Sequence, residues 1–250
     1  MFDPAQMPGA LFRESDLIEQ DRLACADFQS QVRRPEELDI NNRYYSLEKD
    51  SPYGQGDVRL LQAAYAAMIK QVDDQLGRIL DALEVSGQRD NTIVIFTSDH
   101  GEMLGDHGLI QKGCRFYEGL VRVPLIFSWP GHIKAGLRSD ALVELSDKAP
   151  TLLQLVDEEI PDHMTGKSLL PILKGDASPS YHRDFVRCEY YDALQAPDGT
   201  FATMYRDQQY KLVVYHGRAY GELYDLEAVS YTHLRAHETR HDLVCRLLLE

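Results

Sequence analysis

The sequence feature that most constrains the fold is a long amphipathic segment at residues 58–85, followed almost at once by an apolar run at residues 92–96. The second run is apolar throughout, which is typical of a parallel strand covered on both faces. A helix that leads directly into such a strand predicts an α/β layered fold, with helices packed on a sheet. The helical prediction rests on apolar positions at three- and four-residue steps, with Gly87 as the stop: Leu61, Ala64, Tyr65, Met68, Ile69, Val72, Leu76, Ile79, Leu80 and Leu83.

Weaker signals of the same kind predict further elements on both sides. A capping residue before a periodic stretch indicates a helix start, and a short apolar run ended by turn residues indicates a buried strand. The expected helices are Asp16–Val32 after Ser15 and Lys148–Val156 after Ser146 or Asp147, and the expected second strand is Val123–Ser128. Past Pro171, runs rich in aromatic and β-branched residues predict a small antiparallel sheet from Phe185–Tyr191, Thr200–Tyr205, Gln209–Tyr215 and Glu222–Leu226.

The chain therefore divides into four stretches. We expect an irregular N-terminal segment at residues 1–57, the C-terminal part of an α/β domain at residues 58–175, and an antiparallel subdomain at residues 176–228. The last 22 residues, VSYTHLRAHETRHDLVCRLLLE, break from what precedes them and resemble translated sequencing-adaptor sequence joined to a shortened reading frame. We treat residues 229–250 as a non-native tail and leave them out of the fold prediction.

Composition excludes several classes of function. The formal net charge of −14 argues against a nucleic-acid-binding surface. No apolar run approaches the roughly 20 residues that span a bilayer, and the first residues lack the pattern of a signal peptide. The four cysteines form no CxxC motif and no disulfide framework. The compartment and the oligomeric state are left open.

Two polar residues follow the apolar run directly. Asp99 and His100 stand at the end of the predicted strand, where ligand sites of open α/β sheets lie, and Gly101 would allow the backbone to turn there. A carboxylate oxygen and an imidazole nitrogen can share one divalent metal ion. The alternative is that Asp99 caps a turn and His100 is a half-buried polar residue.

A lysine and a second histidine follow within the same glycine-rich stretch. Lys112, held beside a metal ion, would bind a tetrahedral oxyanion and offset charge on a leaving oxygen. His107, in Asp106-His107-Gly108, could serve as a proton donor; the alternative is a loop histidine bonded to the backbone. Together, these residue types predict hydrolysis of a sulfate or phosphate ester.

These motifs resemble the sulfatase family of the alkaline-phosphatase superfamily. The resemblance rests on TIVIFTSDHG at 92–101, GDHG at 105–108, K-G-x-x-F-Y-E-G-x-x-R-V-P-L at 112–125 and WPG at 129–131. It continues through APTLL at 149–153, G-x-S-L-L-P-I-L at 166–173 and ELYDL at 222–226, so that about 170 residues look like the C-terminal part of a sulfatase. The strand-Asp-His-Gly element is shared across the superfamily, whereas the Lys-Gly-x-x-Phe-Tyr-Glu stretch is more specific.

The resemblance implies a mechanism and a site. In the family, a cysteine or serine of a C/S-x-P-x-R motif becomes formylglycine, whose hydrate attacks the sulfur while one Ca²⁺ polarises the sulfate oxygens. Two Ca²⁺ ligands match Asp99 and His100, and a sulfate-contacting lysine matches Lys112. No cysteine or serine of this chain lies in that motif, and the upstream pair of Asp ligands is unmatched. We therefore expect a catalytically inactive sulfatase fragment that binds Ca²⁺ weakly and exposes apolar strand surface.

Three other interpretations are left open. The parent could be a phosphonate or phosphate ester hydrolase, or a phosphoethanolamine transferase, of the same superfamily. The chain could be a non-catalytic binding protein that keeps the fold. It could also be a shortened reading frame with no function of its own. The expected partner in the main interpretation is a carbohydrate, aryl or alkyl sulfate ester.

Overall fold

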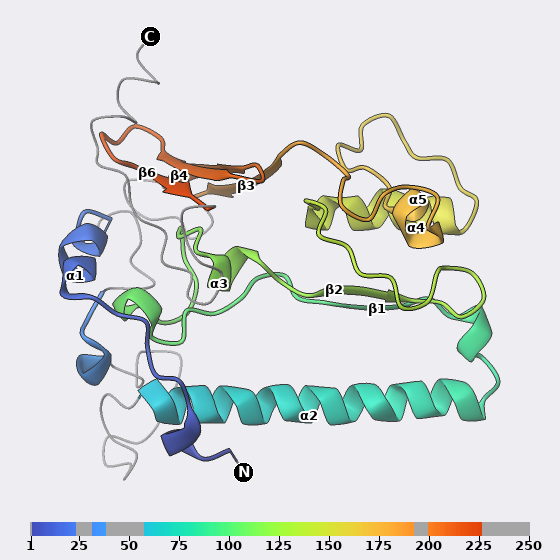
Figure 1. Ribbon diagram of the computed structural model, residues 1–250, viewed down its shortest axis with the longest axis horizontal. Helices are drawn as coiled ribbons and strands as arrows, with labels where there is room; N and C mark the ends of the chain where they lie inside the picture. Colours follow the sequence, from blue (N-terminus) through green and yellow to red (C-terminus); the bar gives the residue numbers. More distant parts are fainter. Residues whose placement is uncertain (1, 24–31, 39–57, 193–199, 227–250) are drawn as a thin grey trace. The chain divides into compact units, whose positions relative to one another are not determined.

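The computed structural model describes residues 2–23, 32–38, 58–192 and 200–226 (Figure 1). The chain divides into two compact units. Among the described residues, the first unit holds residues 2–23, 32–38, 58–88 and 100–123, and the second holds residues 89–99, 124–192 and 200–226. None of the described helices is both long and apolar enough to cross a membrane.

The first unit is helical. Its α-helices are α1 (Glu14–Asp21), α2 (Val58–Val85) and α3 (Glu118–Val121), and its 3-10 turns are η1 (Pro4–Gln6), η2 (Pro35–Glu37) and η4 (Asp106–Gly108). The expected start of the first helix was wrong, because Arg13 is the N-cap and Ser15 lies inside the helix. The Asp16 carboxylate accepts a hydrogen bond from the Arg13 backbone N–H at 2.8 Å, which satisfies one of the amide groups left open at a helix start. Most of the predicted continuation, residues 24–31, lies outside the described residues.

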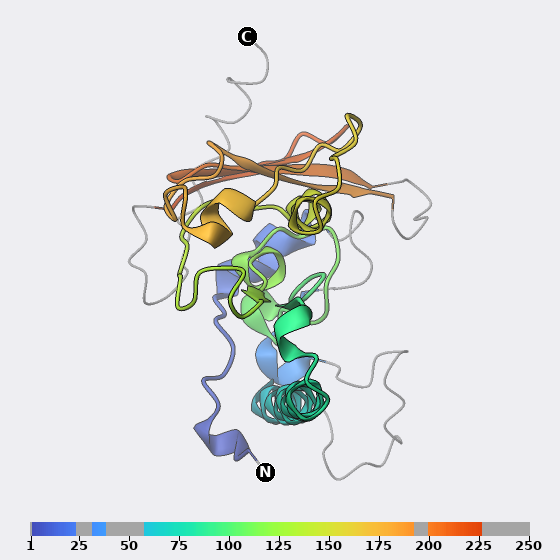
Figure 2. The same ribbon diagram turned by 90° about the vertical axis from the view of Figure 1, so that its right-hand side faces the viewer.

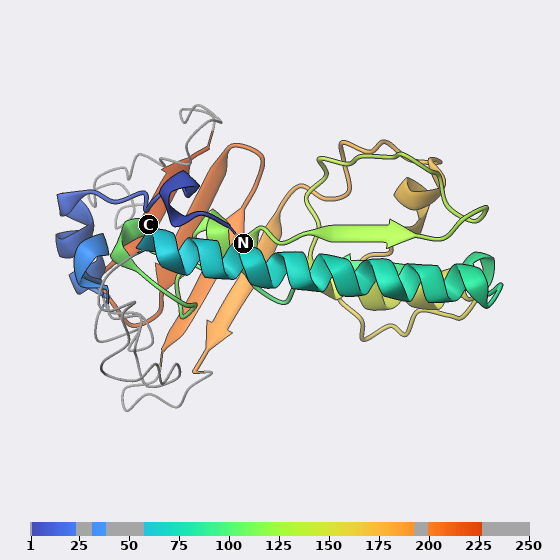
Figure 3. The same cartoon turned by 90° about the horizontal axis from the view of Figure 1, so that it is seen from below.

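Helix α2 confirms the prediction from periodicity. It runs without a break for 28 residues, as Figure 3 shows, and Gly87 follows it with a left-handed φ of +67°. The Gln62 amide clamps the helix to the N-terminal segment by donating to the Gly9 carbonyl at 3.1 Å and accepting from the Gly9 N–H at 3.0 Å. Much of the apolar stripe is exposed, with relative exposures of 53–57% at Met68, Ile69, Val72 and Ile79.

In the second unit, the apolar run becomes strand β1 (Val94–Thr97), paired with β2 (Leu125–Ser128). The two strands are antiparallel, with Val94 opposite Ser128 and Thr97 opposite Leu125. The expectation of a parallel strand covered on both faces was therefore wrong, since every residue of β1 is only half-buried. A continuous apolar run indicates burial but does not determine the direction of the neighbouring strand. The expected exposed apolar surface is present at Ile126 of β2, which is 56% exposed.

Two short helices of the same unit, α4 (Lys148–Leu155) and α5 (Leu170–Lys174), lie on one side of the β1–β2 ribbon (Figures 1 and 2). The turns η3 (Arg89–Asn91) and η5 (Leu145–Asp147) precede β1 and α4. Asp147 is the N-cap of α4, one of the two residues expected there, but its carboxylate makes no cap bond. It accepts instead from the Glu144 backbone N–H, at 2.8 Å, and so closes η5.

The predicted C-terminal sheet is confirmed. Its strands are β3 (Val186–Tyr191), β4 (Phe201–Arg206), β5 (Tyr210–Tyr215) and β6 (Gly221–Asp225), all antiparallel and in chain order. Figure 2 shows the sheet nearly edge-on, as a single layer. Residues on β4 to β6 alternate between buried and more exposed, as expected for a sheet with one covered face. The covered face includes Ala202, Met204, Val213, Tyr215 and Tyr224.

Candidate functional site

The residues singled out as metal ligands stand where the chain leaves β1. Asp99 is exposed and is the last residue of its stretch in the second unit, and His100 begins the next stretch of the first unit. Within the described residues, no group of three or more His, Cys, Asp and Glu side chains gathers in a metal-binding arrangement. The described part of the chain therefore offers only a partial ligand set at this position.

The backbone after His100 is held against α3. The Gly101 N–H donates to the Leu120 carbonyl at 2.8 Å, and the Glu102 N–H donates to the Gly119 carbonyl at 3.2 Å. A Cβ atom on Gly101 would stand 1.7 Å from the Gly119 carbonyl oxygen. Gly101 is not among the glycines with positive φ, so the position requires glycine for this close approach and not for the turn that the sequence suggested.

The His100 imidazole is oriented through both ring nitrogens. Its Nδ1 lies 2.8 Å from the Gly101 carbonyl oxygen, and its Nε2 lies 2.8 Å from the Lys112 ammonium. Lys112 can only donate and the Gly101 carbonyl can only accept, so Nδ1 carries the proton and Nε2 presents its lone pair. Histidines that bind metals commonly have this arrangement, with one ring N–H donating to a carbonyl and the other nitrogen facing a cation.

Lys112 and His100 are two site residues that the sequence predicted and that the structure brings together. Lys112 is exposed, and it follows Gln111, whose backbone has a left-handed φ of 66°. The Gln111 N–H donates to the Glu102 carboxylate, which ties the two ends of the 102–111 loop. The loop therefore turns back so that Lys112 reaches His100 across twelve residues of sequence.

Glu102 is a residue of this region that the sequence argument missed. Burial raises the pKa of its carboxyl group, while hydrogen bonds from the Gln111 and Leu104 backbone N–H groups and the nearby His100 oppose the shift. Its side chain is engaged in closing the loop, so the structure indicates a supporting role. Its position, two residues after His100 in the same loop, was the only available signal.

His107 has different neighbours. Its Nδ1 lies 3.4 Å from Asp16 Oδ1 of α1, and its ring stacks on Tyr117 with the centroids 4.2 Å apart. Its backbone is left-handed, with φ 56° and ψ 22°, and its N–H donates to the Leu11 carbonyl at 2.7 Å. The imidazole is therefore held in one place by a buried carboxylate and an aromatic face. The Asp16 contact, which spans 91 residues of sequence, carried no local signal.

Buried polar side chains connect Tyr117, on which the His107 ring stacks, to helix α1. Arg115 Nε donates to Gln20 Oε1 at 2.8 Å, and Gln20 Nε2 donates to the Tyr117 hydroxyl. Arg115 is only 3% exposed and Gln20 only 1%. Asp106, the residue before His107, accepts from the Leu11 N–H at 2.8 Å, and burial raises the pKa of its carboxyl group. Helix α1 is thus fastened to the loop that carries the predicted site residues.

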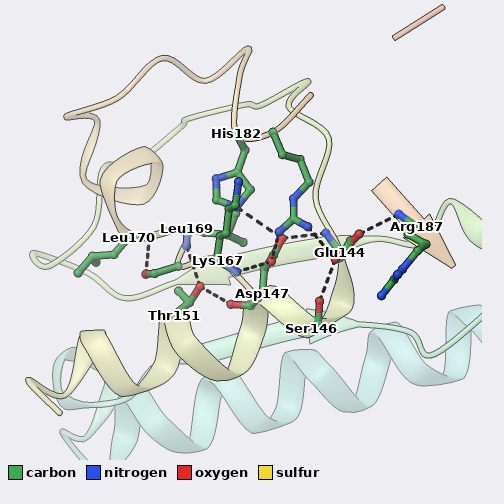
Figure 4. Close-up of polar contacts among 11 residues, drawn as sticks. Glu144, Ser146, Asp147, Thr151, Lys167, Leu169, Leu170, His182 and Arg187 are labelled. Atoms are coloured by element: carbon green, nitrogen blue, oxygen red, sulfur yellow. Dashed lines mark hydrogen bonds and ion pairs between the residues drawn. The ribbon is translucent and has the colours of Figure 1, made fainter. Parts of the chain in front are cut away.

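A second polar cluster lies in the other unit (Figure 4). Asp147 is fully buried; its Oδ1 accepts from the Lys167 N–H at 2.8 Å and pairs with Arg183, and its Oδ2 lies 3.5 Å from His182 Nε2. Arg183 also pairs with Glu144 at 2.7 Å. This Asp147 cluster was not predicted, because Asp147 entered the sequence argument only as a helix cap.

The backbone around the Asp147 cluster is held in the same way. The Thr151 hydroxyl donates to the Asp147 carbonyl at 2.5 Å and accepts from the Leu169 N–H at 2.8 Å. Glu144 accepts from the Arg187 N–H, at 2.8 Å, at the start of β3 (Figure 4). Burial lowers the pKa of His182, with the Asp147 carboxylate opposing the shift. Both carboxylates of the cluster are occupied by donors of the protein itself, so the cluster joins α4, α5 and β3 and leaves little capacity for a ligand.

Comparison with known proteins agrees with the motifs. The family model named Sulfatase matches residues 24–158, and the model for the C-terminal region of N-sulphoglucosamine sulphohydrolase matches residues 105–237. The first match spans more than half of the 250 residues, and the chain belongs to the sulfatase family. The expected family and fold class, an α/β fold of the alkaline-phosphatase superfamily with a small antiparallel C-terminal sheet, are therefore confirmed.

Three relatives illustrate the range of the match. An N-acetylglucosamine-6-O-sulfatase of Bacteroides thetaiotaomicron is 33% identical over 91% of this chain and 46% of its own length. A solved phosphonate monoester hydrolase of Agrobacterium radiobacter is 31% identical, with a TM-score of 0.71 over 91% of this chain and 46% of its own. The solved complex of BT4656 with its substrate D-glucosamine-2-N,6-O-disulfate is 34% identical, with a TM-score of 0.61 over 69% of this chain and 35% of its own. The chain spans less than half the length of each.

Proposed function

We propose that this chain is part of a sulfuric ester hydrolase, in which Asp99 and His100 hold a Ca²⁺ ion and Lys112 contacts the sulfate group. The observation that carries the proposal is the orientation of His100, with Nδ1 bonded to the Gly101 carbonyl and Nε2 facing a cation at 2.8 Å. Sulfatase relatives that act on sulfated sugars support the substrate class.

Asp99 and His100 supply two of the ligands that a Ca²⁺ ion requires. Asp99 offers a hard carboxylate oxygen, and His100 offers one nitrogen with its lone pair already directed away from the backbone. Ca²⁺ prefers six to eight oxygen ligands, so these two residues alone hold it weakly. When bound, the ion would supply positive charge that polarises the sulfate oxygens.

The remaining residues have separate roles. Lys112 stabilises negative charge on the sulfate and on the leaving oxygen, as an exposed ammonium anchored on a glycine-rich loop can do. His107 is the proposed proton donor, and in support of this role Asp16 and Tyr117 hold its ring in one orientation.

The nucleophile is the element that this sequence does not encode. No Cys or Ser lies in a C/S-x-P-x-R motif, so formylglycine cannot form by the route that the resemblance implies. We therefore propose that the 250-residue chain by itself does not hydrolyse sulfate esters.

Calorimetric titration with Ca²⁺ tests the metal assignment. We expect wild-type binding in the range of about 1 mM, and no measurable binding for Asp99→Asn or His100→Gln. The matched controls are Asp162→Asn and His163→Gln, exposed loop residues whose replacement should leave the titration unchanged. Micromolar binding, or millimolar binding that survives His100→Gln, would contradict the proposal. Turnover of an aryl sulfate by the purified chain would contradict its inactivity.

A phosphonate monoester as substrate is the second candidate. The phosphonate monoester hydrolases of Silicibacter pomeroyi and Agrobacterium radiobacter share the fold over 92% and 91% of this chain, with TM-scores of 0.73 and 0.71. Sulfate and a methyl phosphonate monoester both present tetrahedral oxyanions to Lys112. Competition between the two anions, measured by the shift of the Lys112 side-chain NMR signal, would rank them.

A further inference from the structure

We propose that Lys112 and a divalent metal ion compete for the same nitrogen of His100, so that metal binding transfers the Lys112 ammonium from the imidazole to the anion. This inference rests on the proposed function and adds to it a coupling between the two ligands. The observation behind it is the 2.8 Å contact between Lys112 Nζ and His100 Nε2.

The Nε2 atom of a neutral imidazole has one lone pair. His100 Nδ1 is committed to the Gly101 carbonyl at 2.8 Å, so the ring offers a cation no other nitrogen without breaking that bond. A neutral imidazole nitrogen serves either an ammonium proton or a metal ion, and not both at once. A metal ion that uses His100 through Nε2 must therefore displace Lys112.

The displaced ammonium of Lys112 has room to move. Lys112 is exposed and stands on a four-carbon stem, next to Gly113, so its head group can move without moving the backbone. The loop beneath it stays closed, because the Glu102 carboxylate accepts from the Gln111 N–H and not from Lys112. The displaced ammonium keeps its three donors and offers them to a tetrahedral oxyanion in the same neighbourhood.

Binding of the metal ion and binding of the anion are thermodynamically linked through Lys112. If metal binding frees Lys112 and so raises the affinity for the anion, then an anion that holds Lys112 must free His100 Nε2 and raise the affinity for the metal by the same factor. Inorganic sulfate should therefore strengthen Ca²⁺ binding by more than their direct attraction provides. This additional strengthening should disappear in a variant whose residue 112 can bond neither to His100 nor to the sulfate.

Two readouts on the full 250-residue chain test the proposal. After treatment with a chelator, ¹⁵N NMR of His100 should show the proton on Nδ1 and a hydrogen-bonded Nε2, and added Ca²⁺ should shift the Nε2 signal. In calorimetry without sulfate, Lys112→Met should bind Ca²⁺ about tenfold more tightly than wild type. This factor corresponds to the low end of the energy of a charge-assisted hydrogen bond, as expected for an exposed lysine. Sulfate should then enhance Ca²⁺ binding less in Lys112→Met than in wild type.

One control separates this exchange from a general loss of charge. Lys174→Met removes an exposed lysine of the other unit and should leave the Ca²⁺ titration unchanged. Unchanged Ca²⁺ affinity in Lys112→Met, or a proton on His100 Nε2 of the chelated wild type, overturns the exchange. If His100→Gln abolishes Ca²⁺ binding but Lys112→Met does not strengthen it, the proposed function stands and the exchange alone fails. If Ca²⁺ binding survives His100→Gln, the metal site itself is wrong.

Discussion

Gly101 and Gly119 are in backbone contact, so close that a Cβ atom at position 101 would lie 1.7 Å from the Gly119 carbonyl oxygen. Two further hydrogen bonds from this stretch fix the loop that carries His100 against α3. Any side chain at position 101 would therefore push this loop away from α3.

Gly101→Ala should therefore destabilise the chain strongly. The methyl group meets backbone and not a flexible side chain, so relief requires the loop to move, at an expected cost of about 3 kcal/mol or more in the free energy of unfolding. Chemical denaturation measures the loss. Gly77→Ala on α2 is the matched control: a Cβ there meets nothing within 4 Å, and alanine should stabilise the helix by about 1 kcal/mol. Equal denaturation midpoints for the two variants would refute the contact.

Asp147→Asn should cost about 3 kcal/mol of folding free energy, because it leaves the buried Arg183 guanidinium with only the Glu144 carboxylate. The same exchange at the exposed Asp162 keeps the change in charge and should leave stability within about 0.5 kcal/mol of wild type. Comparing the two denaturation curves checks the prediction, and a loss at 147 no larger than at 162 would show that the ion pair does not hold the unit together.

Thr151→Val should destabilise by about 2 kcal/mol, since the buried Leu169 N–H loses the acceptor that now lies 2.8 Å away. Thr151→Ser keeps the hydroxyl and removes only a methyl group, so its loss should stay near 1 kcal/mol. Hydrogen exchange of the Leu169 amide provides the specific readout. Protection that is unchanged in Thr151→Val would argue that another group accepts this bond.

His182 should make stability depend on pH. Burial lowers its pKa in the folded state from the ordinary value of 6.5, while the Asp147 carboxylate opposes the shift and the Arg183 guanidinium favours it. Because the pKa is lowered in the folded state, the unfolded chain takes up a proton at a higher pH than the folded chain does. The neutral ring therefore contributes its full stability above pH 6.5, and this contribution is lost as the pH falls toward the lowered pKa.

Wild type should therefore lose more thermal stability than His182→Asn between about pH 7.5 and about pH 5. Melting temperatures of both proteins across that range provide the measurement. The difference between the two proteins removes the contributions of Glu102 and Asp106, whose raised pKa values act in the opposite direction. A steeper fall for the variant would mean that the protonated ring is the stabilised form.

The sequence predicted those parts of the fold that local patterns determine. Helix α2 and the strands β3 to β6 lie within a few residues of their expected bounds, because side-chain periodicity along one segment reports which face is covered. The direction of β1 relative to β2 was not predictable in this way, since it depends on a partner 28 or more residues away. The division at residues 57, 175 and 228 stays a prediction.

The candidate site was predictable only in part for the same reason. Asp99, His100 and Lys112 were found because they follow a recognisable strand and match a family motif, and their roles stay predictions. The contacts that orient their neighbours could not be found, because Asp16 meets His107 across 91 residues and Asp147 meets Arg183 across 36. No local pattern marks a carboxylate whose partner lies that far along the chain.

The strand order of the C-terminal sheet has a consequence for how this unit assembles. Because β3, β4, β5 and β6 pair only with their neighbours in sequence, each pairing closes a short loop, and the entropy lost at each closure is small. Sheets built from such local contacts form early relative to structures that join distant segments. The Asp147 cluster, which joins residue 144 to residue 187, can then close on a β3 that is already in place. Folding of this unit should thus start at its C-terminal end and proceed toward its helices.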